Sequence, residues 1–226
     1  IMDFLGPLPA DYENARSLNL AFLELLRSRE PGRRYLKGLP PGLKSRLQNL
    51  TRPEIGRVAA TPFLLFSFRE RDDEYWQRIL TDDRSRDLFA TPVSSTDDGT
   101  RLVSAGLGFV WQLAGRNPFA ARILCGASTH WCEQITEQTF FHILAFAGQR
   151  TDLLVLRDGH DAELWRILLE NGVSDRMENR HAARLSALHH ILTRQSPITA
   201  WSAAACASRD PALKVADKSK RWKRSQ

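Results

Sequence analysis

The residues that could support acid–base or nucleophilic chemistry are few and scattered. Asp158, His160 and Asp161 form the densest group, in the run Asp-Gly-His-Asp. Aspartates at the start of a helix commonly cap its first turn, and we expect capping here. His189 and His190 follow on a later predicted helix, with no carboxylate or cysteine at ligand spacing. Because no glycine-rich phosphate loop, nucleophile elbow or His-Glu-x-x-His motif occurs, we expect no enzyme activity.

The three cysteines do not suggest a metal centre. Cys125 and Cys132 flank His130, but their spacing matches no common zinc site, and Cys206 lies far along the chain. We therefore expect buried thiols on a helix, with no metal and no cofactor.

The net charge of +6 is concentrated at the end of the chain. Residues 209–226 contain seven Lys or Arg against two Asp, which leaves the other 208 residues nearly neutral. A solvated end is the simpler interpretation of this basic tail. The alternative is a phosphate-binding arm, which Trp222 among the cations favours. The cations of that arm would be Lys218, Lys220, Arg221, Lys223 and Arg224.

A second group of cations lies on a predicted pair of short helices over Leu43–Ala60, joined at Thr51 in the manner of a helix-turn-helix. These cations could meet DNA phosphates or guanine edges. They are Lys44 and Arg46 on the first helix and Arg52 and Arg57 on the second. The alternative is an ordinary helical hairpin with a solvated basic face.

The elements around these residues recur along the chain. At an offset of 88 residues, positions 34–69 give eight identities in 36, where about two are expected by chance. One extra residue then shifts the offset to 89, and the match resumes from Asp72. The later identities are Asp72 with Asp161, Glu74 with Glu163, Trp76 with Trp165 and Leu80 with Leu169. We interpret this pattern as a tandem duplication.

The periodicity of apolar residues predicts a mostly α-helical fold with short extended connectors. In the first copy it predicts helices near Asp11–Ser28, over Leu43–Leu50, from Thr51, and from Asp72 to Leu80. In the second copy it predicts helices near Arg101–Ala114, from Pro118, from Ser128, over Gln138–Ala147 and over Asp161–Asn171. Asp11, Thr51, Asp72 and Ser128 are the expected N-caps.

Two helices are expected after the second copy. The first runs from a Ser174 cap to about Arg194, with Met177, Ala182, Leu185, Leu188 and Leu192 inward, and the second runs from Pro197 to Cys206. The expected divisions are a first helical repeat (1–90), a linker (91–100), a second repeat (101–172), C-terminal helices packed on the repeats (173–208) and a flexible basic tail (209–226).

The first copy resembles the flagellar transcriptional regulator FlhD over about 55 residues. The resemblance rests on Leu18-Asn19-Leu20 with Phe22-Leu23, on Leu47-Gln48-Asn49-Leu50-Thr51 with Pro53, and on Phe66-Ser67-Phe68-Arg69. Leu65 stands where FlhD has a cysteine, so an FlhD-like inter-subunit disulfide is not available. The resemblance implies an all-helical regulator that pairs with itself and with an FlhC-like subunit at promoters.

Together these features predict a DNA-binding transcriptional regulator, or a subunit of a regulatory complex, built from two FlhD-like units. Its partners would be double-stranded DNA and an FlhC-like protein. The alternative is a helical adaptor that acts through protein contacts alone. It is favoured by the nearly neutral body and by the helix over Gln138–Ala147, which carries no cation. The apolar runs are too short to span a membrane, and the first residues make no signal peptide, so we expect a cytoplasmic protein.

Overall fold

The computed structural model describes residues 6–28, 34–81, 97–148, 150–159 and 161–194. This part of the chain is mostly α-helical, as predicted, with two very short strands. Residues 1–192 form one compact unit, and residues 193–226 form a second one that lies almost wholly outside the described ranges. None of the helices in the described ranges is long and apolar enough to cross a membrane.

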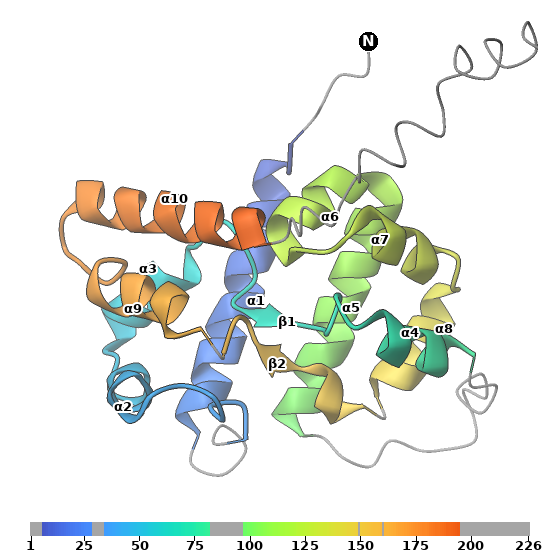
Figure 1. Cartoon of the computed structure of the whole chain (residues 1–226), viewed down its shortest axis with the longest axis horizontal. Helices are drawn as coiled ribbons and strands as arrows, with labels where there is room; N and C mark the ends of the chain where they lie inside the picture. Colours follow the sequence, from blue (N-terminus) through green and yellow to red (C-terminus); the bar gives the residue numbers. More distant parts are fainter. Residues whose placement is uncertain (1–5, 29–33, 82–96, 149, 160, 195–226) are drawn as a thin grey trace, which may run out of the picture. The chain divides into compact units, whose positions relative to one another are not determined.

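The elements before α10 can be grouped into two series, each of which ends in a short strand and a helix, and the second has one more helix and a 3-10 turn (Figure 1). The first series is α1 (Pro9–Arg27), α2 (Pro41–Gln48), α3 (Arg52–Ala59), β1 (Phe66–Ser67) and α4 (Asp73–Leu80). The second series is α5 (Asp98–Arg116), α6 (Pro118–Cys125), α7 (Thr129–Thr136), α8 (Phe140–Ala147), the 3-10 turn η2 (Thr151–Leu153), β2 (Val155–Leu156) and α9 (Ala162–Glu170). The helix α10 (Met177–Arg194) follows them.

Several of these helices begin directly after a residue whose side chain caps the first turn. Ser128 accepts a hydrogen bond from the N–H of Trp131 (3.0 Å), and Asp72 accepts one from the N–H of Tyr75 (3.1 Å), as predicted. Asp11 is not the N-cap that we predicted for α1. The helix begins earlier, at Pro9, and the Asp11 carboxylate accepts from the N–H of Leu8 (2.8 Å) from within the first turn.

The two strands pair with each other, one from each series. They are antiparallel, with Phe66 opposite Leu156 and Ser67 opposite Val155. The N–H of Arg157 extends the contact by donating to the carbonyl of Leu65 (3.1 Å). The extended connectors expected from the sequence are therefore a point at which the two series join.

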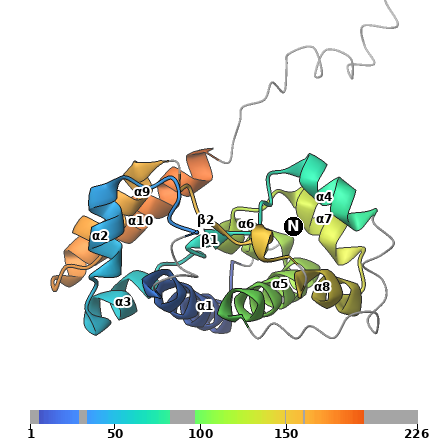
Figure 2. The same ribbon diagram turned by 90° about the horizontal axis from the view of Figure 1, so that it is seen from below.

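The last helix of each series packs against the other series (Figures 1 and 2). In both views α9 lies in the same half of the unit as α2 and α3, while α4 lies in the half that contains α7 and α8. The α2–α9 contact and the edge-to-face pair of Trp76 on α4 with Trp131 on α7, 5.2 Å between ring centres, make this exchange. The long helices α1 and α5 also pack together. A single hydrophobic core results, in which Trp76, Trp131 and Trp165 are fully buried.

Contacts at matching positions are reciprocal. The Arg69 Nε donates to the carbonyl of Asp152 (3.2 Å), and the Arg157 Nε donates to that of Leu64 (2.5 Å). Each arginine and each carbonyl residue is separated from its counterpart by 88 positions. The indoles of Trp76 and Trp165 likewise donate to the carbonyls of Arg69 and Arg157, respectively. The two arginine contacts cross the junction between the series, whereas each indole contact lies within its own series.

Two further expectations about the ends of elements were wrong. Residues 98–100, placed in the linker, form the first turn of α5, and residues 91–96 lie outside the described ranges. Ser174 does not start α10, which begins at Met177. Its buried residues are Ala183, Ala187 and Ile191, and Leu188 packs against the core, as predicted. Met177 is 70% exposed, Leu185 is 54% exposed and Ala182 is exposed, so these three were wrong. The helix predicted from Pro197 lies outside the described ranges.

Candidate functional site

The candidate DNA-binding corner is the turn between α2 and α3. α2 packs on α1 and α9, while α3 packs on α1, so both helices are seated on the body of the protein. The junction is a capping box: the Thr51 N–H and hydroxyl both donate to the Glu54 carboxylate, at 2.7 and 2.8 Å. Pro53 lies in the first turn of α3, where a missing N–H costs nothing.

The carboxyl group of Glu54 has a strongly lowered pKa. The hydrogen bond from the Thr51 backbone, followed by those from the Thr51 hydroxyl and Arg46, lowers the pKa of Glu54 from 4.5 to about 2. Arg46 lies 2.6 Å from Glu54, so its guanidinium bridges α2 and α3. The ion pair therefore connects α2 to α3. It also neutralises Arg46, one of the four candidate DNA-binding cations.

The other three candidates differ in their surroundings. Lys44 is half-buried and Arg52 is exposed, and neither has a hydrogen-bond or ion-pair partner within the described ranges. Arg57 is held in place: its guanidinium donates to the carbonyl of Val173 (2.8 Å) and pairs with Asp175. Of the four, Lys44 and Arg52 therefore keep their charges available to a partner.

Arg57 belongs to a cluster of cations that joins α3 to α10. Arg184 on α10 donates to the carbonyl of Arg57 (3.1 Å). Burial, with the nearby charges of Arg180 and Arg16, lowers the pKa of Arg184. Periodicity alone could not have revealed this cluster, because its members come from three helices. The tail cations Lys218, Lys220, Arg221, Lys223 and Arg224 lie outside the described ranges.

The counterpart of this corner in the second series is aromatic. Phe140 and Phe141 on α8 are 38% and 63% exposed, and their ring centres lie 6.2 Å apart. A groove of about 520 Å³ runs between α5 and α8, and Trp111, Phe140 and Leu144 line it. Large apolar side chains gathered on a surface commonly mark a protein contact. The two matching helices, α3 and α8, thus present different chemistry.

The acid–base candidates differ in their roles. Asp158 does not cap a helix, contrary to the expectation, and its Oδ2 is buried without a hydrogen-bond partner in the described ranges. Asp161 caps α9, as predicted, by accepting from the N–H of Glu163 (2.9 Å). His190 has a carboxylate partner outside its own helix: its Nε2 lies 3.1 Å from Asp161. That partner comes from a segment 29 residues earlier, which local spacing does not reveal. His160 lies outside the described ranges.

The thiols of Cys125 and Cys132 are buried, as predicted. Within the described ranges, no group of three or more His, Cys, Asp or Glu side chains could hold a metal ion. Cys206 lies outside those ranges.

No family model matches this chain, and the comparisons with curated proteins and with solved structures also give no match.

Proposed function

We propose that this chain is a DNA-binding transcriptional regulator, or a subunit of a regulatory complex, made of two FlhD-like units fused in tandem. The two units would form within one chain what a symmetric dimer forms from two. One unit would contact DNA through the α2–α3 corner, with the basic tail adding phosphate contacts. The other would bind a protein partner, such as an FlhC-like subunit, through α8.

The reciprocal junction is the observation that carries the proposal. In a two-fold symmetric dimer, every contact between residue i of one subunit and residue j of the other occurs twice. The paired bonds from Arg69 to Asp152 and from Arg157 to Leu64 follow that rule, and so does the exchange of α4 and α9. An ancestral dimer whose subunits were later fused accounts for both.

The position of Leu65 also supports the proposal. The FlhD resemblance assigns to this position a cysteine that links two subunits. Leu65 is fully buried, and its carbonyl accepts from the N–H of Arg157 in the other series. The position thus lies at the junction that an inter-subunit link would cross. In a fused chain the polypeptide itself supplies the connection.

The proposed DNA contact rests on Lys44 and Arg52. They are the two cations of the α2–α3 corner without partners in the described ranges, and Arg52 opens α3 at the end where the helix dipole also attracts phosphate. Arg46 and Arg57 would support this contact indirectly, because their ion pairs with Glu54 and Asp175 stabilise the α2–α3 corner.

A gel-shift titration of the full chain on duplex DNA, at several salt concentrations, tests this function. A regulator of this kind loses affinity steeply as salt rises, since each neutralised phosphate releases counterions. Lys44→Gln with Arg52→Gln should reduce the salt slope by about two units, one for each lost contact. Deletion of residues 209–226 should reduce it further.

The matched control is Arg122→Gln, which removes an exposed arginine of α6 that has no partner in the described ranges. It should leave the slope unchanged. If the double variant and the tail deletion both bind DNA like the parent chain, the contact is elsewhere and the site assignment is wrong.

The adaptor function is the second candidate, and the exposed aromatic side chains of α8 favour it. Under this alternative, Phe141→Ser abolishes the capture of a partner protein, and the full chain shows no salt-dependent affinity for DNA. If the parent chain shifts DNA at low salt, the adaptor function alone is excluded.

A further inference from the structure

Four arginines from three helices lie close together on the first half of the chain. We call them the arginine cluster: Arg16 on α1, Arg57 on α3, and Arg180 and Arg184 on α10. The two residues of α10 are four positions apart and therefore share one face of the helix. Arg184 donates to the carbonyl of Arg57 (3.1 Å), and the charges of Arg180 and Arg16 act on it. The fold thus gathers like charges that are far apart in the sequence.

Two members of the cluster are held by the backbone of residues 173–175. The Arg57 Nη1 donates to the carbonyl of Val173 (2.8 Å). The Arg180 Nη1 donates to the carbonyls of Ser174 (2.9 Å) and Asp175 (2.7 Å). These acceptors carry no net charge, so they fix the positions of the guanidiniums without neutralising them.

Carboxylates balance only part of the cluster. Asp175 pairs with Arg57, and Glu13 lies 3.7 Å from Arg16. Their side chains are 89% and 72% exposed, so water weakens both ion pairs. Neither arginine of α10 has an ion-pair partner in the described ranges. The cluster therefore keeps two positive charges in excess.

Arg184 is the least satisfied member. Its Nε is buried and has no hydrogen-bond acceptor in the described ranges. Burial, followed by the charges of Arg180 and Arg16, lowers its pKa. The carbonyl of Arg57 lies in the last turn of α3, where the helix dipole supplies only a fraction of a negative charge. An anion among these side chains would therefore stabilise the charged form of Arg184.

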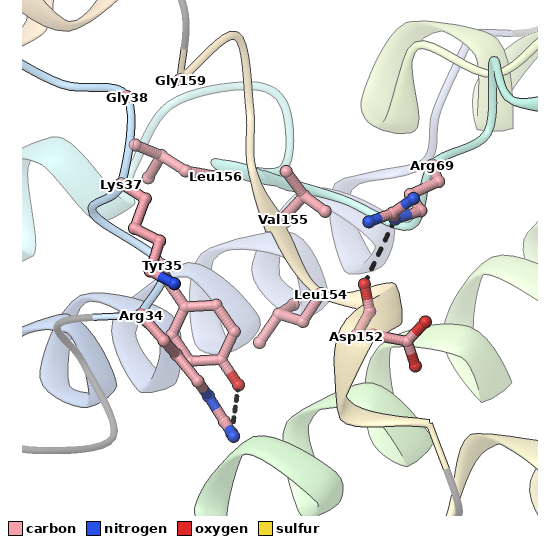
Figure 3. Close-up of a pocket in the computed structure, with 10 residues that line it drawn as sticks. All are labelled: Arg34, Tyr35, Lys37, Gly38, Arg69, Asp152, Leu154, Val155, Leu156 and Gly159. Carbon is pink, nitrogen blue, oxygen red and sulfur yellow. Dashed lines mark hydrogen bonds between the residues drawn. The ribbon is translucent and has the colours of Figure 1, made fainter.

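The cavity over strand β2 provides a contrast (Figure 3). It has a volume of about 430 Å³, with Arg34 and Lys37 on one side and Arg69 on the other. Its three cations are matched by three nearby carboxylates, Asp72, Asp97 and Asp152. The excess of positive charge distinguishes the arginine cluster from this cavity.

We propose that the arginine cluster binds a doubly charged phosphate group, that of inorganic phosphate or of a small phosphate monoester. Guanidinium groups present paired N–H donors that match the oxygens of phosphate. A phosphate monoester carries a charge of about −1.5 to −2 at pH 7, which balances the excess of the cluster. A phosphate of the DNA backbone carries one charge and would leave part of the excess unbalanced. The site differs from the proposed DNA contact, which rests on Lys44 and Arg52.

Isothermal titration of the full chain with inorganic phosphate, at neutral pH and constant ionic strength, tests the proposal. Binding should be saturable, with a dissociation constant in the millimolar range or below. Arg184→Gln should weaken it at least tenfold, because a charged donor is lost. Arg16→Gln should weaken it severalfold, and since Arg16 is exposed, this variant should fold normally. The control is Arg122→Gln, which should bind phosphate like the parent chain.

Two methyl esters test the charge of the ligand. Monomethyl phosphate keeps the double charge and should bind about as tightly as inorganic phosphate. Dimethyl phosphate has the single charge of a DNA backbone phosphate and should bind at least tenfold more weakly. In the gel shift, Arg184→Gln should keep the salt slope of the parent chain. Circular dichroism checks that each variant keeps the parent helix content.

Saturable binding of phosphate and monomethyl phosphate that is weakened in the cluster variants and kept in Arg122→Gln supports the site. Absence of saturation, or an equal loss of binding in Arg122→Gln, overturns it. If Arg184→Gln does not fold, unchanged binding in Arg16→Gln overturns it as well. Dimethyl phosphate that binds as tightly as the monoester, or a lower DNA salt slope in Arg184→Gln, would assign the cluster to the DNA backbone instead. A chain that binds no DNA leaves the phosphate titration fully interpretable.

Discussion

The guanidinium Nη1 of Arg157 lies 3.1 Å from the Oε1 of Glu70, with only 4% and 3% of the two side chains exposed. The same guanidinium donates to the carbonyls of Leu64 (2.5 Å) and Phe66 (2.7 Å), and the Glu70 carboxylate accepts from the Phe68 N–H (2.8 Å). This buried ion pair therefore lies where the two series of elements join. Both side chains also form hydrogen bonds with the backbone of the first series.

Glu70→Gln should destabilise the chain strongly, because it leaves the Arg157 charge buried without a counter-charge. Breaking a buried pair by removing one partner costs about 3–5 kcal/mol, and urea unfolding measures the loss. Glu70→Leu with Arg157→Met should recover only part of it, since no unpaired charge remains but the backbone groups of Leu64, Phe66 and Phe68 lose these hydrogen-bond partners. The control is Arg166→Gln at an exposed ion pair with Glu163, where little change is expected. A Glu70→Gln variant as stable as the parent would contradict the assigned role.

Asn19 connects α1 to the segment that precedes β1 through hydrogen bonds. Its Nδ2 donates to the carbonyls of Ala59 (3.2 Å) and Phe63 (2.8 Å), and its Oδ1 accepts from the N–H of Leu65 (2.8 Å). Asn19→Ala should lower the free energy of unfolding by about 3 kcal/mol, because several buried groups lose their partner.

Asn19→Asp should be worse than Asn19→Ala, although it is nearly isosteric. A carboxylate would face the two carbonyls that now accept from the amide, and like partial charges repel. Ser17→Ala, at an exposed position of the same helix, should change stability by less than about 0.5 kcal/mol. Thermal melts of the three variants give the order, and a melting temperature for Asn19→Asp above that of Asn19→Ala would show that the amide donor is unimportant.

The α2–α3 corner should show a pH dependence due to Glu54. Its pKa is lowered from 4.5 to about 2 in the folded protein, so its charge stabilises the fold above pH 4.5, and this contribution is lost as the pH falls toward 2. Glu54→Gln should cost about 1 kcal/mol at neutral pH, as other helix caps do. The difference between parent and variant should shrink below pH 4.5. A difference that stays constant across this window would exclude the ionised carboxylate as its cause.

The buried cysteines should react slowly with alkylating reagents. Burial raises the pKa of the Cys132 thiol to about 11, and it also raises the pKa of Cys125, so few thiolates form at mildly alkaline pH. In a Cys206→Ser background, iodoacetamide labelling of the native chain should be far slower than that of the urea-unfolded chain. Mass spectrometry counts the labels. Equal rates in the two states would mean that the thiols are accessible in the fold.

Local signals predicted the helices well, because caps and breaks act within a few residues. The run Thr51-Arg-Pro-Glu54 defines the start of α3 by itself, and Asn117-Pro118 does the same for α6. Periodicity was only partly right for α10: Leu188 packs against the core, but Met177 and Leu185, which it also placed inward, are exposed. The buried stripe consists instead of Ala183, Ala187 and Ile191, since small side chains allow close packing on the body.

Long-range relationships were the part that the sequence did not reveal. The cation pattern marked Arg57 as a possible DNA contact, but its partners Val173 and Asp175 lie more than a hundred residues away. The cavity beside Lys37 and Arg69 is likewise invisible in the sequence, because its two walls come from distant segments. Repeats in a sequence show which elements correspond, but they do not show which helix covers which.

The exchange of α4 and α9 affects how the chain is made. During synthesis the first series leaves the ribosome complete, yet α2 still lacks the helix that covers it until residue 170 has emerged. Until then the nascent chain exposes apolar surface that a self-contained domain would already have buried. Chaperone capture and protease cleavage should therefore concentrate in this interval of translation.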